Sequence, residues 1–182
     1  MGTMTARRRE FLAGALALGA LGTGAAVTIG GWTPFEDGDA LTAFDLESID
    51  APGSAAGTIT VPERGSVTVL ELFATWCGVC AELMVPMATV FDEFGEDVQF
   101  VSVTNEPLGR TTTREDVAAW WREHGGRWPV AHDADLALTS ALEATSVPYT
   151  VVCDEGNAVV WSDTGYKPAD ELREPIRAAL GG

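Results

Sequence analysis

Two cysteines spaced three residues apart give the strongest chemical signal in the sequence. Cys77 and Cys80 lie in the segment FATWCGVC, directly after an apolar run, in a chain of 182 residues whose one other cysteine is Cys153. A pair with this spacing can staple the chain, supply half of a metal site, attach a haem or form a reactive dithiol. The neighbouring residues discriminate between these four kinds of site.

The sequence argues against three of the four kinds of site. Haem attachment needs a histidine directly after the second cysteine, where Ala81 stands. A structural zinc site needs a second ligand pair, but Cys153, His124 and His132 are scattered. A passive disulfide across so short a loop would constrain the unfolded chain little, because that entropic effect grows with loop length. The spacing therefore favours a redox pair.

The elements expected around the cysteines suit thiol chemistry. The run VTVLELF predicts a strand over Val67–Phe73 that is buried on both faces, and a helix begins at the cysteines. Amide N–H groups and the dipole at a helix start stabilise a thiolate, which favours Cys77 as the attacking thiol. Cys80, one turn later, lies close enough to attack a mixed disulfide at Cys77 and release the partner.

The rest of the domain alternates between strand and helix patterns. The expected elements are a strand over Val98–Thr104, a helix capped by Thr113 and ended by Gly125–Gly126, a helix over residues 134–142, an antiparallel hairpin over residues 149–162, and a helix over Ala169–Leu180 that Pro175 strains or kinks. This order predicts an α/β fold in which helices flank a central mixed β-sheet.

The N-terminal part of the chain has another character. Residues 1–31 contain an arginine cluster and then an uncharged stretch rich in Ala, Gly and Leu, and the core Arg8–Leu12 resembles a twin-arginine export signal. About twenty residues in a helix span roughly 30 Å, the thickness of the bilayer hydrocarbon. We expect a twin-arginine-type signal or membrane anchor, and favour the uncleaved anchor. Residues 32–56 predict an acidic linker and the start of the domain, which occupies residues 57–182 and opens with a short hairpin near residues 58–63.

The charge of the chain excludes one class of partner. Acidic residues number 27 against 11 basic ones, the net charge is -16, and Lys167 is the only lysine. Such a surface repels phosphate backbones, so we expect no nucleic acid partner. It also suits a protein that stays hydrated in high salt, which predicts a halophilic and specifically haloarchaeal source; an acidic protein from an ordinary organism is the alternative.

Three segments carry a resemblance to a known family. FATWCGVC is similar to the signature Phe-x-Ala-x-Trp-Cys-x-x-Cys, SVPYTVVCDEGNAVV resembles a segment of Val-Pro, strand, Asp, turn and strand, and residues 98–133 resemble a central insertion. Together they resemble the thioredoxin superfamily in its TlpA-like (ResA- and DsbE-like) branch of exported thiol-disulfide oxidoreductases, from about Leu41 to the C-terminus. The resemblance implies a thioredoxin-like fold with the TlpA-like central insertion.

The resemblance also assigns roles to individual residues. Pro148 would be a cis-proline facing the disulfide, and Val147 would offer its backbone to an extended substrate segment; an ordinary trans turn is the alternative. Trp76 would shield the disulfide and shape the docking surface, unless it belongs to the core. Glu71, six residues before Cys77, stands where relatives can hold a buried acid that relays the proton of the resolving cysteine. Its alternative is a strand-end carboxylate that reaches water.

The sequence departs from the family pattern at several positions. Val79 replaces the frequent proline before the second cysteine, which leaves the redox potential open, and Pro86 comes one place later than usual. Leu83 replaces a frequent glutamate, for which the neighbouring Glu82 is a candidate substitute. Cys153 stands at a usually aliphatic strand position, which predicts a buried, unpaired thiol.

The resemblance implies a direction of electron flow as well. We expect the domain to reduce disulfides in cysteine-containing exported client proteins, to receive electrons from a membrane donor, to lie outside the cytoplasm on its anchor, and to use no metal or cofactor besides the Cys77–Cys80 disulfide. The alternatives are a disulfide-donating oxidase, a copper-binding chaperone with Cys77, Cys80 and His132 as ligands, and a binding module in which the disulfide is only structural.

Overall fold

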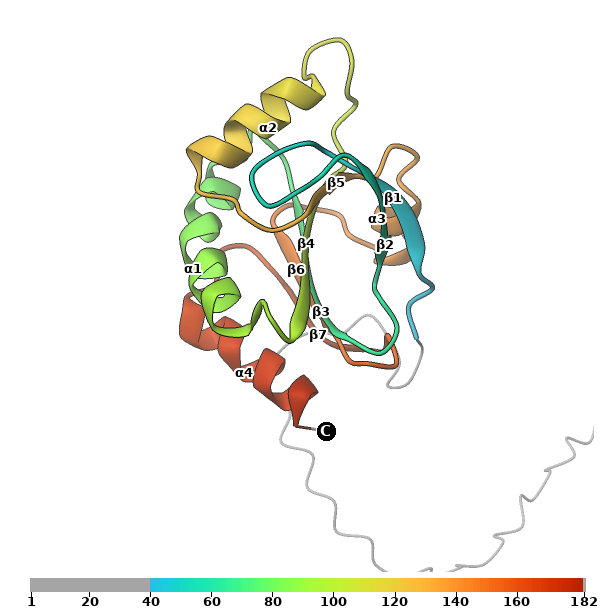
Figure 1. Cartoon of the computed structure of the whole chain (residues 1–182), viewed down its shortest axis with the longest axis vertical. Helices are drawn as coiled ribbons and strands as arrows, with labels where there is room; N and C mark the ends of the chain where they lie inside the picture. The colour runs from blue at the N-terminus through green and yellow to red at the C-terminus, as the bar shows by residue number, and fades with distance from the viewer. Residues whose placement is uncertain (1–39, 182) are drawn as a thin grey trace, which may run out of the picture.

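The computed structural model describes residues 40–181, which build one mixed seven-stranded sheet covered by helices on both faces (Figure 1). The strands follow the order β2-β1-β5-β4-β3-β6-β7 across the sheet. Their bounds are β1 Phe44–Ser48, β2 Gly57–Val61, β3 Val67–Phe73, β4 Val98–Thr104, β5 Val130–His132, β6 Tyr149–Cys153 and β7 Val159–Thr164. The helices are α1 Gly78–Phe94, α2 Arg114–Glu123, α3 Ala137–Ala141 and α4 Ala169–Leu180. The expected α/β fold with a mixed sheet is confirmed.

The centre of the sheet is the pair of strands β3 and β4, whose predicted bounds are confirmed. Every residue of β3 is buried, and β4 is buried except at Gln99. The two strands run parallel, while β6 pairs antiparallel with the other edge of β3. Strands surrounded in this way lack alternation because both of their faces meet apolar layers.

Alternation along β3 divides its side chains between two cores. Val69 and Phe73 contact the core that α1, α2 and α4 share, whereas Leu70 and Leu72 contact the core that α3 covers. Because successive side chains of a strand point to opposite faces, Glu71 falls on the face of Val69 and Phe73, under α1. A carboxyl group is thus placed inside the larger of the two cores.

The N-terminal hairpin differs from the expected one. It consists of β1 and β2, in antiparallel register from Phe44↔Val61 to Ser48↔Gly57, and does not lie within residues 58–63. Strand β1 therefore stands inside residues 32–56, in the stretch that we expected to be a linker and the start of the domain. Of its five residues only Leu46 and Ser48 are buried, so the apolar pattern is too short to predict a strand.

Two helices also differ from expectation. α3 begins only at Ala137, because Asp133 accepts hydrogen bonds from the backbone N–H groups of Leu138 and Thr139 and so fixes the turn before the helix. α4 continues as one helix through Pro175. That proline is buried with Ile176, so packing outweighs the one backbone hydrogen bond that proline removes. The predicted cap by Thr113 at the start of α2 is confirmed, and Asp116 completes a capping box with it.

Within residues 40–181, no helix is long and apolar enough to cross a membrane. The expected signal or anchor, residues 1–31, lies outside the described residues.

The third cysteine is buried in the sheet, as predicted. Cys153 ends β6, has no solvent exposure and is unpaired. Burial, with a smaller contribution from the charge of Asp154, raises the pKa of its thiol to about 12. At neutral pH almost no thiolate forms there, and the sulfur is shielded from solvent.

We predict that Cys153 resists alkylation in the native protein and reacts only after unfolding. The measurement is mass spectrometry of the reduced protein after a short iodoacetamide pulse, with and without denaturant. Cys77 serves as the internal control, since it should be labelled in the native state. Rapid native labelling of Cys153, or a disulfide joining it to Cys77 or Cys80 in peptide maps, would contradict the prediction.

Candidate functional site

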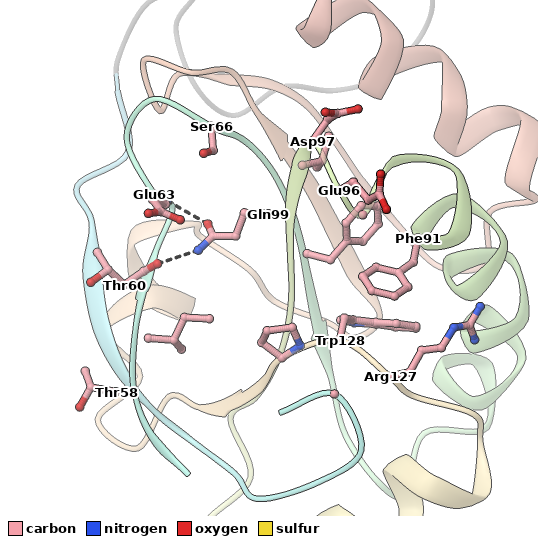
Figure 2. A pocket seen from close by; sticks show the side chains of 16 residues that line it. Thr58, Thr60, Glu63, Ser66, Phe91, Glu96, Asp97, Gln99, Arg127 and Trp128 are labelled. Atoms are coloured by element: carbon pink, nitrogen blue, oxygen red, sulfur yellow. Dashed lines mark hydrogen bonds between the residues drawn. The ribbon is translucent and has the colours of Figure 1, made fainter. Parts of the chain in front are cut away.

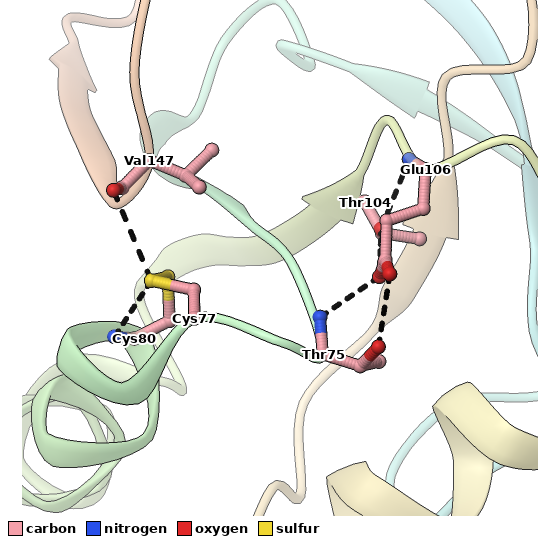
Figure 3. The surroundings of a disulfide bond; sticks show 6 residues. All are labelled: Thr75, Cys77, Cys80, Thr104, Glu106 and Val147. Carbon is pink, nitrogen blue, oxygen red and sulfur yellow. Dashed lines mark hydrogen bonds between the residues drawn. A yellow bond between two sulfur atoms is a disulfide. The ribbon is translucent and has the colours of Figure 1, made fainter. Parts of the chain in front are cut away.

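A disulfide joins Cys77 and Cys80 at the start of α1 (Figure 3). Their Cα atoms are 5.2 Å apart. Cys77 is the N-cap of the helix, and its sulfur accepts a hydrogen bond from the backbone N–H of Cys80 at 3.1 Å. The first turn of α1 contains no acidic residue, so no carboxylate there offsets the favourable interaction of the helix dipole with a thiolate on Cys77. The geometry can stabilise a thiolate on Cys77 once the disulfide is reduced.

The two cysteines differ in accessibility. Cys77 is 7% exposed, whereas Cys80 is 0% exposed. Two apolar side chains flank them on the surface: Trp76 is 75% exposed and Val79 is 42% exposed. Trp76 is therefore not part of the core, which was the alternative reading. A partner can approach the Cys77 sulfur between apolar side chains, and Cys80 can react only from within the protein.

The loop before β6 lies against the disulfide. The sulfur of Cys77 is 3.8 Å from the carbonyl oxygen of Val147, a contact that Figure 3 shows. The Val147–Pro148 peptide bond is cis, which confirms that expectation. The carbonyl of Pro148 accepts a hydrogen bond from the Gly165 N–H, which ties this loop to the end of β7. Binding of a substrate segment by Val147 and Pro148 stays a prediction.

Glu71 is completely buried, so the alternative of a carboxylate in contact with water is wrong. One of its oxygens, Oε2, accepts a hydrogen bond from the Ser102 hydroxyl at 2.7 Å, while Oε1 has no partner within the described residues. Burial raises the pKa of Glu71 to about 7, and the bond from Ser102 lowers it by a smaller amount. The carboxyl can therefore gain or lose a proton near neutral pH. Glu82, the other candidate proton carrier, is exposed on α1.

A second buried carboxylate, which sequence reasoning missed, holds the loop in front of the cysteines. Glu106 accepts hydrogen bonds from the Thr75 backbone N–H at 2.8 Å, the Thr75 hydroxyl at 2.9 Å and the Thr104 hydroxyl at 3.0 Å (Figure 3). It is 5% exposed. Thr75 stands two residues before Cys77, so Glu106 fixes the segment that presents Trp76 and the attacking sulfur.

The position of Glu106 follows from strand register. Phe73 pairs with Thr104 where the parallel strands β3 and β4 end together. Thr75 comes two residues after the end of β3, and Glu106 comes two residues after the end of β4. The sequence therefore held a signal for this contact. An acidic residue follows one buried strand by two places, and a threonine follows the neighbouring buried strand by two places.

The histidine proposed for the copper alternative does not join the cysteines. Nε2 of His132 lies 2.9 Å from the backbone carbonyl oxygen of Glu106. Within the described part of the chain, no three His, Cys, Asp or Glu side chains form a group that could hold a metal ion.

The described residues also form a cavity of about 620 Å³. Figure 2 shows the side chains that line it. Its lining includes Val98, where β4 begins, whereas the disulfide follows the last residue of the parallel strand β3. Gln99 bridges its wall by donating to the Thr60 carbonyl and accepting from the Glu63 N–H. Neither cysteine lines it, so the redox chemistry takes place elsewhere.

The fold and the Cys-x-x-Cys disulfide define a thiol-disulfide oxidoreductase. The chain belongs to the Redoxin family, whose model matches residues 36–180. This membership and the fold support the predicted thiol-disulfide oxidoreductase activity, while the narrower TlpA-like branch stays a prediction. No curated protein matches the sequence significantly.

Solved structures with the same fold come from several bacteria. A protein described as thiol:disulfide interchange protein DsbE from Chlorobium tepidum is 24% identical, with a TM-score of 0.66, and the match covers 80% of this chain and 99% of that one. StoA from Bacillus subtilis is 18% identical, with a TM-score of 0.63 and coverage of 75% and 97%. The exposed lipoprotein thioredoxin Etrx1 from Streptococcus pneumoniae is 18% identical, with a TM-score of 0.63 and coverage of 75% and 99%. These likenesses establish the thioredoxin-like fold.

We predict that Glu106→Gln lowers both stability and the rate of protein disulfide reduction. The amide keeps one accepting oxygen but replaces the other by an NH2 group and removes the negative charge, so the Thr75 loop loses a hydrogen bond to a charged acceptor, at a cost of about 1–3 kcal/mol. The measurements are urea unfolding and an insulin reduction assay. Thr75→Ser, which keeps both donors, should behave like the wild type, and so should Glu96→Gln at an exposed position. Wild-type stability and rate in Glu106→Gln would show that the loop does not depend on this carboxylate.

Proposed function

We propose that the protein reduces disulfides in other exported proteins while tethered to the outer side of the cell membrane by its N-terminal segment. The observation that carries this proposal is the pairing of an accessible sulfur with a buried one: Cys77 lies between Trp76 and the Val147 carbonyl, and Cys80 lies behind it. Such a site suits attack on a disulfide in another protein, followed by internal release.

The reaction proceeds in two exchanges. The Cys77 thiolate attacks one sulfur of the client disulfide, so that a mixed disulfide forms and the other client sulfur leaves with the electron pair. The Cys80 sulfur then attacks Cys77, the bond to the client breaks, and the second client sulfur leaves as a thiolate. The Cys77–Cys80 disulfide that results is the state in the structure. A membrane electron donor returns it to the dithiol, and the cycle needs no cofactor besides this disulfide.

Binding of the client uses the surface around the sulfur. An extended client segment lies along the Val147–Pro148 backbone, and Trp76 covers the reacting disulfide with an apolar ring that is already exposed in the free protein. Backbone recognition of this kind tolerates many client sequences. Clients are therefore selected by an accessible disulfide in an extended segment.

Location outside the cytoplasm is supported by sequence and by likeness. The arginine cluster and apolar stretch of residues 1–31 have the composition of a signal or anchor. The structurally similar Streptococcus pneumoniae protein is described as an exposed lipoprotein thioredoxin. The net charge of -16 on the whole chain suits a protein that stays hydrated in concentrated salt outside a halophilic cell.

A redox titration tests the direction of electron flow. For a reductant we expect a potential near that of thioredoxin, about -270 mV, and well below the glutathione couple. The measurement is the fraction of the Cys77–Cys80 disulfide in glutathione and dithiothreitol buffers. A potential near that of the strong oxidant DsbA, about -120 mV, would make the protein a disulfide donor instead.

Trapping variants test the order of attack. Cys80→Ser should accumulate mixed disulfides with clients, because Cys77 still attacks and no internal thiol releases the partner. Cys77→Ser should not, because Cys80 is buried. Non-reducing gels of cell-surface extracts provide the measurement. Equal trapping by the two variants would refute the assignment of Cys77 as the attacking thiol.

A further test concerns Glu71, which we propose as the acceptor of the Cys80 proton. Glu71→Gln should slow disulfide exchange and abolish the rise in rate as pH increases through about 7, where Glu71 ionises. Because its folded pKa lies above the unfolded value, the wild type loses stability as pH rises from about 4.5 through about 7, by about 3 kcal/mol.

The same variant should therefore unfold at higher urea than the wild type at pH 8 and lack this advantage at pH 4. Stopped-flow kinetics and urea unfolding at the two pH values give the measurements. An unchanged pH–rate profile in Glu71→Gln would leave the carboxyl with a structural role only.

A further inference from the structure

Three completely buried side chains form a hydrogen-bond chain that ends at Glu71. The indole Nε1–H of Trp128 donates to Ser102 Oγ at 2.9 Å, and the Ser102 hydroxyl donates to Glu71 Oε2 at 2.7 Å. Trp128 belongs to the loop between α2 and β5, whereas Ser102 and Glu71 are paired residues of β4 and β3. A loop distant from the cysteines in sequence thus reaches the carboxyl under them.

The chain has a fixed direction because of its first member. An indole N–H is a donor only, so Ser102 Oγ must accept from Trp128. The single hydroxyl proton of Ser102 is then free for Glu71, the acceptor that the structure provides for it. Oε2 of Glu71 accepts this bond whether the carboxyl is ionised or protonated. A proton taken up by Glu71 therefore belongs on the other oxygen, Oε1.

Glu71 lies in a buried region on the face of the sheet that the reacting cysteines cover. Glu71 pairs with Ser102 on β4 and with Thr150 on β6, and directly paired residues share one face of a sheet. This is the face covered by α1, whose Cys80 packs in the same core as Phe73 and Val69. Neither Oε1 nor the Thr150 hydroxyl has a partner within the described residues. The oxygen left free by Ser102 is thus the one available for proton exchange.

We propose that Trp128 and Ser102 are positioning residues that hold the transferable proton of Glu71 on Oε1 during the resolving step. The inference rests on the proposed role of Glu71 as the acceptor of the Cys80 proton. When the Cys80 sulfur bonds to Cys77, the proton of its thiol moves to Oε1, the bond from Cys77 to the client breaks, and the client sulfur leaves with the electron pair. The proton returns to solvent when Glu71 ionises again.

Other titratable groups on this face do not replace the contact with Ser102. They are, element by element, Cys77 and Cys80 on α1, Glu106 after β4, His124 at the end of α2, and Asp163 on β7, which is ion-paired with Lys167. Within the described residues Glu71 forms no hydrogen bond to any of them, and α4 presents apolar Leu172 and Ile176 to this core. The Ser102 hydroxyl is the polar contact that sets the orientation of the carboxyl.

The experiment measures Glu71 directly and separately from the rate. The infrared carboxyl band of Glu71 is isolated by subtracting the spectrum of Glu71→Gln, and it is followed from pH 4 to pH 10. In Ser102→Ala the midpoint should rise by about one pH unit, because an ionised carboxylate loses a hydrogen-bond donor. The C=O band of the protonated form should move to higher frequency, since its carbonyl oxygen loses the same donor. The pH–rate profile of the resolving step should shift with the midpoint.

Trp128→Phe tests whether the indole acts through Ser102. As a single substitution, Trp128→Phe should raise the Glu71 midpoint by less than Ser102→Ala does. In a Ser102→Ala background it should cause no further shift. A shift caused by lost packing would instead persist in that background. Ser54→Ala is the matched control, since Ser54 is a buried serine that hydrogen-bonds to the Val130 backbone. It should lose similar stability and keep the Glu71 midpoint unchanged.

The outcomes separate the inference from the proposal beneath it. An unchanged rate in Glu71→Gln overturns the proton relay and the inference with it. A slowed Glu71→Gln combined with an unshifted midpoint and profile in Ser102→Ala overturns the inference alone. A shift from Trp128→Phe that is fully retained in the Ser102→Ala background also overturns it, because the indole would then act by packing.

Discussion

The parallel pairing of β3 with β4 is the constraint on which the site depends. Its register sets Glu71 beside Ser102 and ends the two strands together at Phe73 and Thr104. The segments that leave this edge meet because they start side by side, which brings Glu106 to Thr75. A slip of one residue between these strands would turn Glu71 toward the other core and separate the carboxylate from the loop before the cysteines.

Two buried carboxyl groups on this strand pair have different surroundings. Glu106 accepts three hydrogen bonds and fixes a loop, so its oxygens are occupied. Glu71 accepts one bond and keeps an oxygen free, and burial raises its pKa to about 7. The strand pair therefore has an acid that holds a loop just beyond its end, Glu106, and an acid with a raised pKa in its middle, Glu71. Both side chains are glutamates, so their different hydrogen-bond partners come from their positions along the two strands.

The parts of this arrangement that the sequence predicts are those with strong local patterns. The buried runs Val67–Phe73 and Val98–Thr104 are mostly apolar, which predicts two buried strands. The cap residue Thr113 marks the start of the helix that follows it. The Cys-x-x-Cys spacing predicts the disulfide chemistry directly. Strands β1 and β5 were beyond prediction because each is short, and each is stabilised by pairing with distant segments.

Some contacts of the candidate site could be predicted from the sequence, and others could not. The burial of Glu71 follows from its place in an apolar strand. The bond from Trp128 does not, because it joins a loop to a strand 26 residues earlier, and only the closed fold brings them together. The role of Glu106 lies between these cases: its contact depends on the register of two strands that the sequence already predicts, and register is a relation that one-dimensional patterns do not state.

The burial of Cys153 has a consequence for the route by which the protein matures. Three cysteines in an unfolded chain can join in three different pairs, and two of these would trap a scrambled product in an oxidising compartment. Once β6 has paired with β3 and β7, the Cys153 thiol is buried, and only the pairing of Cys77 with Cys80 remains possible. A domain that folds before its thiols are oxidised therefore forms the Cys77–Cys80 disulfide alone, and needs no isomerase to correct it.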